Sequence, residues 1–196
     1  MQPHIFIFMG RSGCGKGTQA DLLMKLLREK DPNTPVLYLE TGAKFREFIK
    51  GGSYSSKRSA EVYATGARQP DFLAIHFWAD FLIDSFEGHE HIVADGTPRS
   101  LPEAQLLIQA FNFYNRIPHI IYLDVSRDWA VDRLTARGRI DDVKPEEIAK
   151  RLDWFDTDVA PAVDFFRTHP QAKFYELSGE RTVEEIHVDL MEKLGL

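Results

Sequence analysis

A glycine-rich stretch at residues 10–18 places the strongest constraint on how this chain can fold. It follows an apolar run at residues 5–9 and leads into a segment of helical composition that begins at Gln19. Glycines let the backbone turn its N–H groups around an anion, Lys16 adds a positive charge, and the N-terminus of the following helix points at the same place. The order strand, phosphate loop and helix predicts a site for a nucleotide polyphosphate.

Five short apolar runs recur along the chain, separated by stretches of helical character such as residues 74–86. The runs lie at residues 5–9, 36–39, 92–94, 120–123 and 172–177. Runs of this length are typical of buried strands, and their alternation with helices predicts a parallel sheet with helices on both faces. We therefore predict an α/β fold with a five-stranded parallel sheet that carries the phosphate loop.

Ligands bind to sheets of this kind beyond the carboxyl ends of the strands. The residues that directly follow the predicted strands are 10–18, 41–42, 95–99 and 178–179. The third of these reads Asp-Gly-Thr-Pro-Arg. A carboxylate at Asp95 can hold Mg²⁺ through water. Gly96 allows a ligand to approach closely, and Pro98 fixes a turn that aims Arg99 at a phosphate.

The composition is compatible with one sizeable hydrophobic core. The chain has 196 residues, of which 43% are hydrophobic and 12% aromatic, and this length is within the usual range of a single domain. The formal net charge of −6 and a pI near 5.6 argue against broad binding to nucleic acid or to an anionic membrane. We expect a monomer whose phosphate sites are local clusters of arginine and lysine.

Cysteine and histidine usage argues against disulfides and zinc. Cys14 is the single cysteine, which excludes an internal disulfide and a zinc knuckle, and the seven histidines are scattered without ligand spacing. The chain does not begin with the basic start and apolar run of a signal peptide, and no apolar stretch is long enough to span a bilayer. These features predict a reducing, soluble and cytoplasmic setting.

The motifs, taken in order, resemble the nucleoside monophosphate kinases, adenylate kinase above all. The phosphate loop continues as Gly-Lys-Gly-Thr-Gln at residues 15–19, and the turn at 95–99 matches the family's Asp-Gly-Phe-Pro-Arg with Thr97 in place of Phe. An Arg-Gly-Arg-x-Asp-Asp pattern from Arg137, followed by Arg151, resembles the family's short lid. The resemblance extends from residue 5 to residue 181.

This resemblance implies reversible transfer of the terminal phosphoryl group of ATP to a nucleoside monophosphate, with AMP as the first choice (ATP + AMP = 2 ADP). It implies Mg²⁺ bound with ATP and a short lid without zinc. It also implies one kinase domain over residues 1–196, with a helical monophosphate-binding insert at about 41–70 and a lid at about 137–147. Both inserts are expected to close over the substrates before transfer.

Site residues follow from the matched motifs. Those expected to bind ATP are Gly13, Cys14, Gly15, Lys16, Gly17, Thr18, Arg133, which stacks on the adenine, and Arg181, which contributes its backbone. Those expected to bind the monophosphate are Thr41, Arg46, Ala67, Arg68, Gln69, Gly96, Arg99 and Glu103. The catalytic set is Lys16, Arg99, Arg137, Arg139 and Arg151, and Asp95 is the expected magnesium partner through water.

The position expected to contact the acceptor base departs from the family pattern. The family's adenylate kinases carry Gln four residues after the arginine of the turn, where this chain has Glu103. A Gln amide matches both adenine N1 and N6, whereas an ionised carboxylate only accepts and suits guanine better. The alternative is that Glu103 points to solvent or binds an arginine such as Arg68, while Gln105 or backbone groups contact the base. GMP and pyrimidine monophosphates therefore remain possible acceptors.

Two other classes of function are alternatives to a kinase. A nucleotide-dependent switch requires Asn-Lys-x-Asp and Asp-x-x-Gly elements, and the sequence contains neither. A catalytically weak kinase-like assembly or regulatory protein stays open because the chain departs from the family pattern at Lys44, Arg68, Thr97 and Glu103. An assay of ADP formation with each monophosphate distinguishes these classes.

Overall fold

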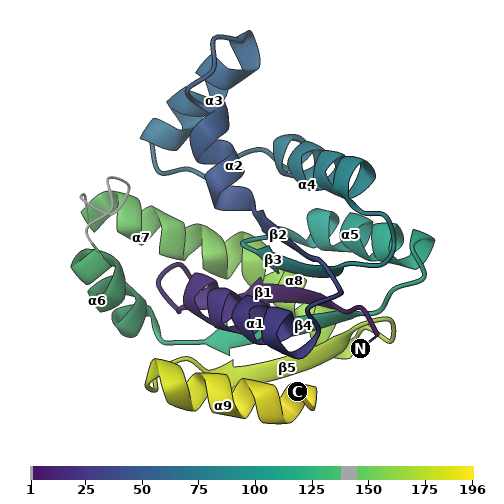
Figure 1. Ribbon diagram of the computed structural model, residues 1–196. Helices are drawn as coiled ribbons and strands as arrows, with labels where there is room; N and C mark the ends of the chain where they lie inside the picture. Colours follow the sequence, from purple (N-terminus) through teal and green to yellow (C-terminus); the bar gives the residue numbers. More distant parts are fainter. Residues whose placement is uncertain (1, 138–144) are drawn as a thin grey trace.

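A computed structural model describes residues 2–137 and 145–196 and contains the predicted five-stranded parallel sheet (Figure 1). The strand order is β2-β3-β1-β4-β5, and every neighbouring pair is parallel. The strands are β1 (Ile5–Met9), β2 (Val36–Glu40), β3 (His91–Asp95), β4 (Pro118–Asp124) and β5 (Lys173–Ser178). Each coincides with a predicted apolar run to within one or two residues, so the predicted fold class is confirmed.

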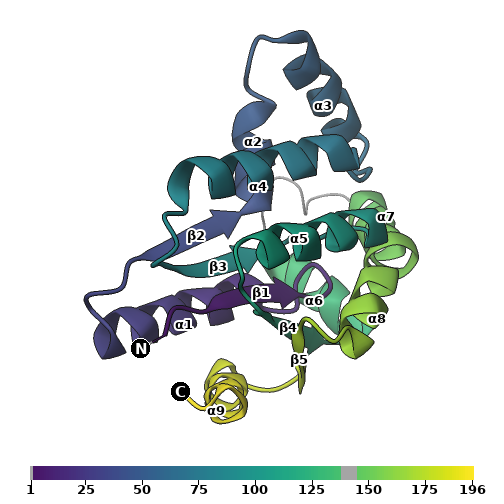
Figure 2. The same cartoon turned by 90° about the vertical axis from the view of Figure 1, so that its right-hand side faces the viewer.

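Helices cover both faces of this sheet (Figures 1 and 2). They are α1 (Lys16–Lys30), α2 (Thr41–Phe48), α3 (Tyr54–Ala64), α4 (Asp71–Ser85), α5 (Leu101–Phe113), α6 (Arg127–Arg137), α7 (Pro145–Trp154), α8 (Ala160–Thr168) and α9 (Val183–Leu194). A π-helical turn, η2 (Phe155–Val159), joins α7 to α8. The first helix ends at Lys30, directly before the turn-forming residues that begin at Asp31.

The core is split by the sheet into two layers because successive strand residues point to opposite faces. From β1, Phe6 and Phe8 pack among the residues of α1 and α9, together with α6 and α7. Ile5, Ile7 and Met9 pack on the other side with α4, α5 and α8. Burial on both faces explains why the central strands are continuous apolar runs instead of alternating patterns.

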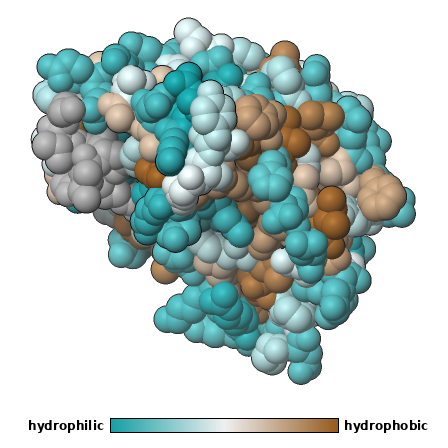
Figure 3. All heavy atoms as spheres, turned by 90° about the horizontal axis from the view of Figure 1, so that it is seen from above, coloured by the Kyte–Doolittle hydropathy of each residue, from teal (hydrophilic) through white to brown (hydrophobic). Residues whose placement is uncertain are grey.

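Helices α2 and α3 project away from the sheet, and α3 lies farthest from it (Figures 1 and 2). The segment at about residues 41–70, which the resemblance predicts to be a helical insert, contains α2 and α3. Seen from above, the surface mixes hydrophilic and hydrophobic side chains, with hydrophobic ones toward the centre and right of the view (Figure 3). Within the described residues, the helices are all too short or too polar to cross a membrane.

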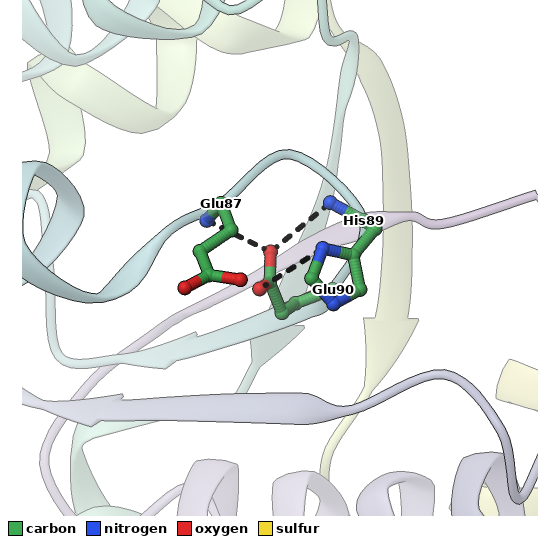
Figure 4. Close-up of side chains that lie close together, drawn as sticks. All are labelled: Glu87, His89 and Glu90. Carbon is green, nitrogen blue, oxygen red and sulfur yellow. Dashed lines mark hydrogen bonds and ion pairs between the residues drawn. The ribbon is translucent and has the colours of Figure 1, made fainter.

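The loop between α4 and β3 is held by one buried carboxylate (Figure 4). Glu90 is only 5% exposed, and its Oε2 accepts the backbone N–H groups of Glu87, Gly88 and His89 at 3.1 Å each. Its Oε1 lies 3.5 Å from His89 Nδ1. Although Glu87, His89 and Glu90 lie close enough to share a metal ion, three N–H donors already occupy one oxygen of Glu90. The carboxylate therefore acts as the anchor of this turn.

Three histidines that are far apart in the sequence gather at the amino ends of the strands. The His4 backbone N–H donates to His91 Nδ1 at 3.0 Å, and His4 Nδ1 lies 3.2 Å from His119 Nε2. His119 Nδ1 in turn lies 3.1 Å from the Tyr175 hydroxyl. Burial lowers the pKa of all three histidines, and for His119, with His4 and Lys173 adding positive charge nearby, it reaches about 4.

Acid is expected to destabilise the protein through these histidines. The folded state holds His119 neutral with a pKa of about 4, compared with 6.5 for an ordinary histidine. Stability is therefore complete above pH 6.5 and declines as the pH falls from 6.5 toward 4. His119 alone contributes a loss of about 2 kcal/mol near pH 4.5. Urea unfolding of wild type and of His119→Gln between pH 6.5 and 4 measures this loss. If the free energy of unfolding falls equally steeply with pH in both proteins, His119 is not its cause.

Candidate active site

A cavity of about 1120 Å³ opens at the carboxyl ends of the strands. This is the edge where ligands of parallel sheets bind. The structure brings most of the predicted site residues to its wall, namely Gly13, Cys14, Gly15, Lys16, Gly17, Thr18, Arg46, Ala67, Arg68, Gln69, Asp95, Gly96, Arg99, Arg133, Arg137, Arg151 and Arg181. Thr41 and Glu103 are fully buried behind the wall, and Arg139 lies outside the described residues.

The phosphate loop connects β1 to α1 through glycines in the left-handed region. Gly10, Gly13 and Gly15 have φ values of 142°, 89° and 97°, and a Cβ at Gly10 would come within 2.5 Å of the Leu123 carbonyl oxygen. Among the described residues, no side chain caps the N-terminus of α1, whose cap is Gly15. The first-turn N–H groups are therefore left for an anion.

The Lys16 side chain folds back onto this loop. Its Nζ donates to the carbonyl oxygens of Gly10 and Arg11, both at 2.9 Å, and lies 3.7 Å from Cys14 Sγ. Burial raises the pKa of the Cys14 thiol, with the Lys16 charge opposing the shift. A neutral, buried thiol is a poor nucleophile, so Cys14 fills space in the loop while Lys16 carries its charge.

Asp95 ends β3 directly beside the phosphate loop. Its Oδ1 is buried and has no hydrogen-bond partner among the described residues. Its Oδ2 would lie 3.3 Å from a Cβ at residue 17, so Gly17 leaves room for the carboxylate. Burial raises the pKa of Asp95, while the nearby Lys16 charge lowers it. A carboxylate with one unsatisfied oxygen fits a hydrated magnesium ion held close to the loop.

Two arginines of the cavity wall converge at Gly42. A Cβ there would lie 3.2 Å from Arg46 Nη1 and 3.5 Å from Arg99 Nη2. Arg46 Nη2 donates to Glu40 Oε1 at 2.6 Å, and Arg99 Nε donates to the Gly96 carbonyl oxygen at 2.7 Å. Because both guanidinium groups face one point with several N–H groups each, this part of the cavity suits a phosphate group.

The segment that follows α3 is braced by side chains that the sequence analysis assigned to the monophosphate. Gln69 Oε1 accepts from Ser59 Oγ at 2.8 Å, and Gln69 Nε2 donates to the Ser59 carbonyl oxygen at 2.9 Å. Arg68 pairs with Asp71 and lies 3.6 Å from Asp158 of η2. These contacts fix the turn between α3 and α4 at the edge of the cavity.

Helices α6 and α7 supply three further cations of the cavity, Arg133, Arg137 and Arg151. The Arg133 guanidinium lies over the Trp129 ring, 4.9 Å from its centroid, and both residues line the cavity. Arg137 and Arg151 line the same wall. The predicted lid lies largely at residues 138–144, which are outside the described residues. Arg133 thus presents a flat guanidinium against an aromatic ring, an arrangement that can extend to an adenine.

Sequence reasoning missed two groups at this site. Glu40 is the last residue of β2 and lines the cavity, so the rule that ligands bind after strand ends could have identified it. Arg11 of the loop pairs with Asp156 of η2 at 2.5 Å and lies over the Phe155 ring at 4.6 Å. Nothing in the local sequence predicts that Arg11 contacts η2, because the loop and η2 are far apart in the chain.

Comparison with known proteins identifies the family to which this site belongs. The sequence profile described as adenylate kinase matches residues 8–171. The chain belongs to the adenylate kinase family. It is 27% identical to an adenylate kinase of Prochlorococcus marinus (strain MIT 9301) over 196 residues, which covers all of both chains. It is 29% identical to an adenylate kinase of Porphyromonas gingivalis (strain ATCC 33277) over 187 residues, covering 93% of this chain and 91% of the relative.

Membership of this family makes the protein an ATP-dependent nucleoside monophosphate kinase. The phosphate loop, the arginines of the cavity and the parallel sheet fit this activity. Positioning and charge neutralisation account for most of catalysis in phosphoryl transfer. The cavity is lined by several cations that can serve both tasks, among them Lys16, Arg46 and Arg99.

Replacing the loop lysine is expected to abolish most of the activity without unfolding the protein. Lys16→Ala removes a charge that would stabilise the transferring phosphoryl group, and it should lower kcat by roughly 10²–10³-fold. Lys25→Ala is the matched control, because Lys25 lies on the same helix with its side chain 75% exposed. Steady-state kinetics and thermal melting measure both effects. Full activity in Lys16→Ala would rule out the role assigned to the loop.

Proposed function

We propose that the acceptor of this kinase is AMP, so that ATP and AMP yield two molecules of ADP. The proposal is supported by one observation above all: the phosphate loop and the Arg46–Arg99 pair line the same cavity. A donor triphosphate and an acceptor monophosphate can then meet between them. Relatives of similar length that carry the name adenylate kinase support AMP as the acceptor.

On the donor side, the loop N–H groups and Lys16 would hold the β- and γ-phosphates of ATP. Lys16 has to exchange its two carbonyl partners for phosphate oxygens, which carry more negative charge. Arg133 would stack on the adenine from its position over Trp129. Arg181 would line the same pocket through its backbone, while its side chain pairs with Asp189 at 2.6 Å.

On the acceptor side, Arg46 and Arg99 would hold the monophosphate, whose oxygen is already ionised near neutral pH. No general base is then required, because the nucleophile needs positioning and not deprotonation. Arg137, Arg139 and Arg151 would surround the transferring group. Arg46 exchanges Glu40 for the phosphate when the acceptor binds.

Magnesium is the cofactor that this site would use. Asp95 would hold it through water, consistent with its buried Oδ1, which lacks a partner among the described residues. Bound Mg²⁺ neutralises charge on the phosphates of ATP and fixes their geometry. Asp95→Asn keeps the size of the side chain and removes the charge that would attract the ion.

Activity assays with four acceptors test the proposed function. ADP formation from Mg·ATP should be fastest with AMP, measured as kcat/KM beside GMP, CMP and UMP, and Lys16→Ala serves as the inactive control. A preference for GMP or a pyrimidine monophosphate would overturn AMP as the acceptor. Absence of product with all four would favour the catalytically weak, kinase-like class.

Closure of α3 over the cavity is expected when both substrate sites are filled. The segment already touches α7, because Lys150 Nζ donates to the Thr65 carbonyl oxygen at 3.0 Å. A bisubstrate analogue should slow hydrogen exchange across residues 47–65 by excluding water from the cavity. Lack of added protection in this segment would contradict closure.

A further inference from the structure

Two residues that depart from the family motif, Thr97 and Glu103, contact each other at the turn between β3 and α5. Thr97 is 1% exposed and Glu103 is 0% exposed, although they follow a strand end that faces the cavity. Thr97 Oγ1 donates to Glu103 Oε1, and the Arg99 backbone N–H donates to Glu103 Oε2 at 2.6 Å. Both oxygens of the carboxylate are thus used within the turn that carries Arg99.

The same turn is tied to the helices behind it. Ser100 Oγ accepts from the Glu103 backbone N–H at 3.3 Å and so caps α5. Ser100 Oγ also donates to Asp71 Oδ1 of α4 at 2.9 Å. Glu103 therefore ties the start of α5 to the turn that follows β3. Its side chain binds Thr97 and Arg99, and its backbone N–H binds Ser100.

Glu103 also balances the charge of Arg99. Burial lowers the pKa of Arg99. The negative charges of Glu103 and Asp95 both raise it, and Glu103 has the larger effect. Burial raises the pKa of Glu103, while the hydrogen bonds from Thr97 and Arg99 and the Arg99 charge lower it. A glutamine at this position would supply no countercharge.

The Glu103 carboxylate does not face the cavity. The wall is formed here by Gly96, Pro98 and Arg99, and neither Thr97 nor Glu103 lines it. To reach a bound base, the carboxylate would have to leave both of its donors buried without a partner, which is strongly unfavourable. Thr97 supplies the hydroxyl that keeps it in place.

We propose, on the basis of the proposed function, that Glu103 is a positioning residue for Arg99 and does not read the acceptor base. Its carboxylate fixes the turn through Thr97 and the Arg99 backbone, and it offsets the charge with which Arg99 attracts the acceptor phosphate. Its effect is therefore the same for every nucleoside monophosphate, whatever the base.

Substitutions that separate charge from geometry test this role. In Glu103→Gln, the amide oxygen can accept from the Arg99 N–H and the amide nitrogen can donate to Thr97, so the turn is kept and the charge is lost. KM should fall about three- to tenfold, by one common factor for AMP, GMP, CMP and UMP, and should change more than kcat. Gln105→Glu, at an exposed position of α5, is the control and should not reproduce the shift.

Substitutions at Thr97 test the geometry. Thr97→Val removes the hydroxyl at nearly constant volume and should lower kcat about tenfold by loosening Arg99. Thr97→Ser keeps the donor and should restore most of this loss. If Val and Ser behave alike in kinetics and differ only in melting temperature, Thr97 serves stability alone and the proposal is wrong.

The outcomes that overturn the proposal are distinct from failure of the proposed function. If Glu103→Gln alters the ratio between bases more than about threefold, the side chain reads the base. An unchanged KM for all four acceptors would mean that Glu103 only stabilises the turn, and the proposal would be wrong. If wild type forms no ADP with any acceptor, the proposed function fails. In that case, calorimetry with AMP still tests the role of Glu103. Glu103→Gln should bind AMP more tightly than wild type, and an unchanged affinity for AMP would refute the role.

Discussion

The parallel pairing of β1 with β3 on one side and β4 on the other is the constraint on which the site depends. The register sets Phe8 beside Asp95 and Met9 beside Tyr122. The loop that follows Met9 must then turn next to the carboxylate of Asp95. Because parallel strands all finish at one edge, groups that are far apart in the sequence share a single cavity there.

Carboxylates accompany the two arginines that converge at Gly42. Arg46 pairs with Glu40, and Arg99 is balanced by Glu103. Such contacts keep long, flexible side chains near the geometry that a phosphate requires, which favours catalysis through preorganisation. They also compete with the phosphate for the same charges. A protein with a net charge of −6 can in this way maintain a local anion site.

Some elements could be predicted closely because their signal is local. The end of α1 at Lys30 follows from the turn residues that begin at Asp31, and the strands follow from apolar runs bounded by polar ones. The π-helical turn η2 has no comparable signal. Its Asp156 pairs with Arg11, a residue 145 positions earlier, so that contact depends on how α7 and α8 pack against the phosphate loop.

The sequence by itself determined the fold class, the phosphate loop and the order of motifs along the sheet edge, because each depends on periodicity and on backbone freedom within a few residues. The tertiary structure decided where side chains with several possible partners point. Glu103 could face a base, solvent or an arginine, and burial beside Thr97 selected the turn. Likewise His4, His91 and His119 came together only when three strand starts were aligned. In both cases the reason is that burial and the choice of partner depend on residues distant in the chain.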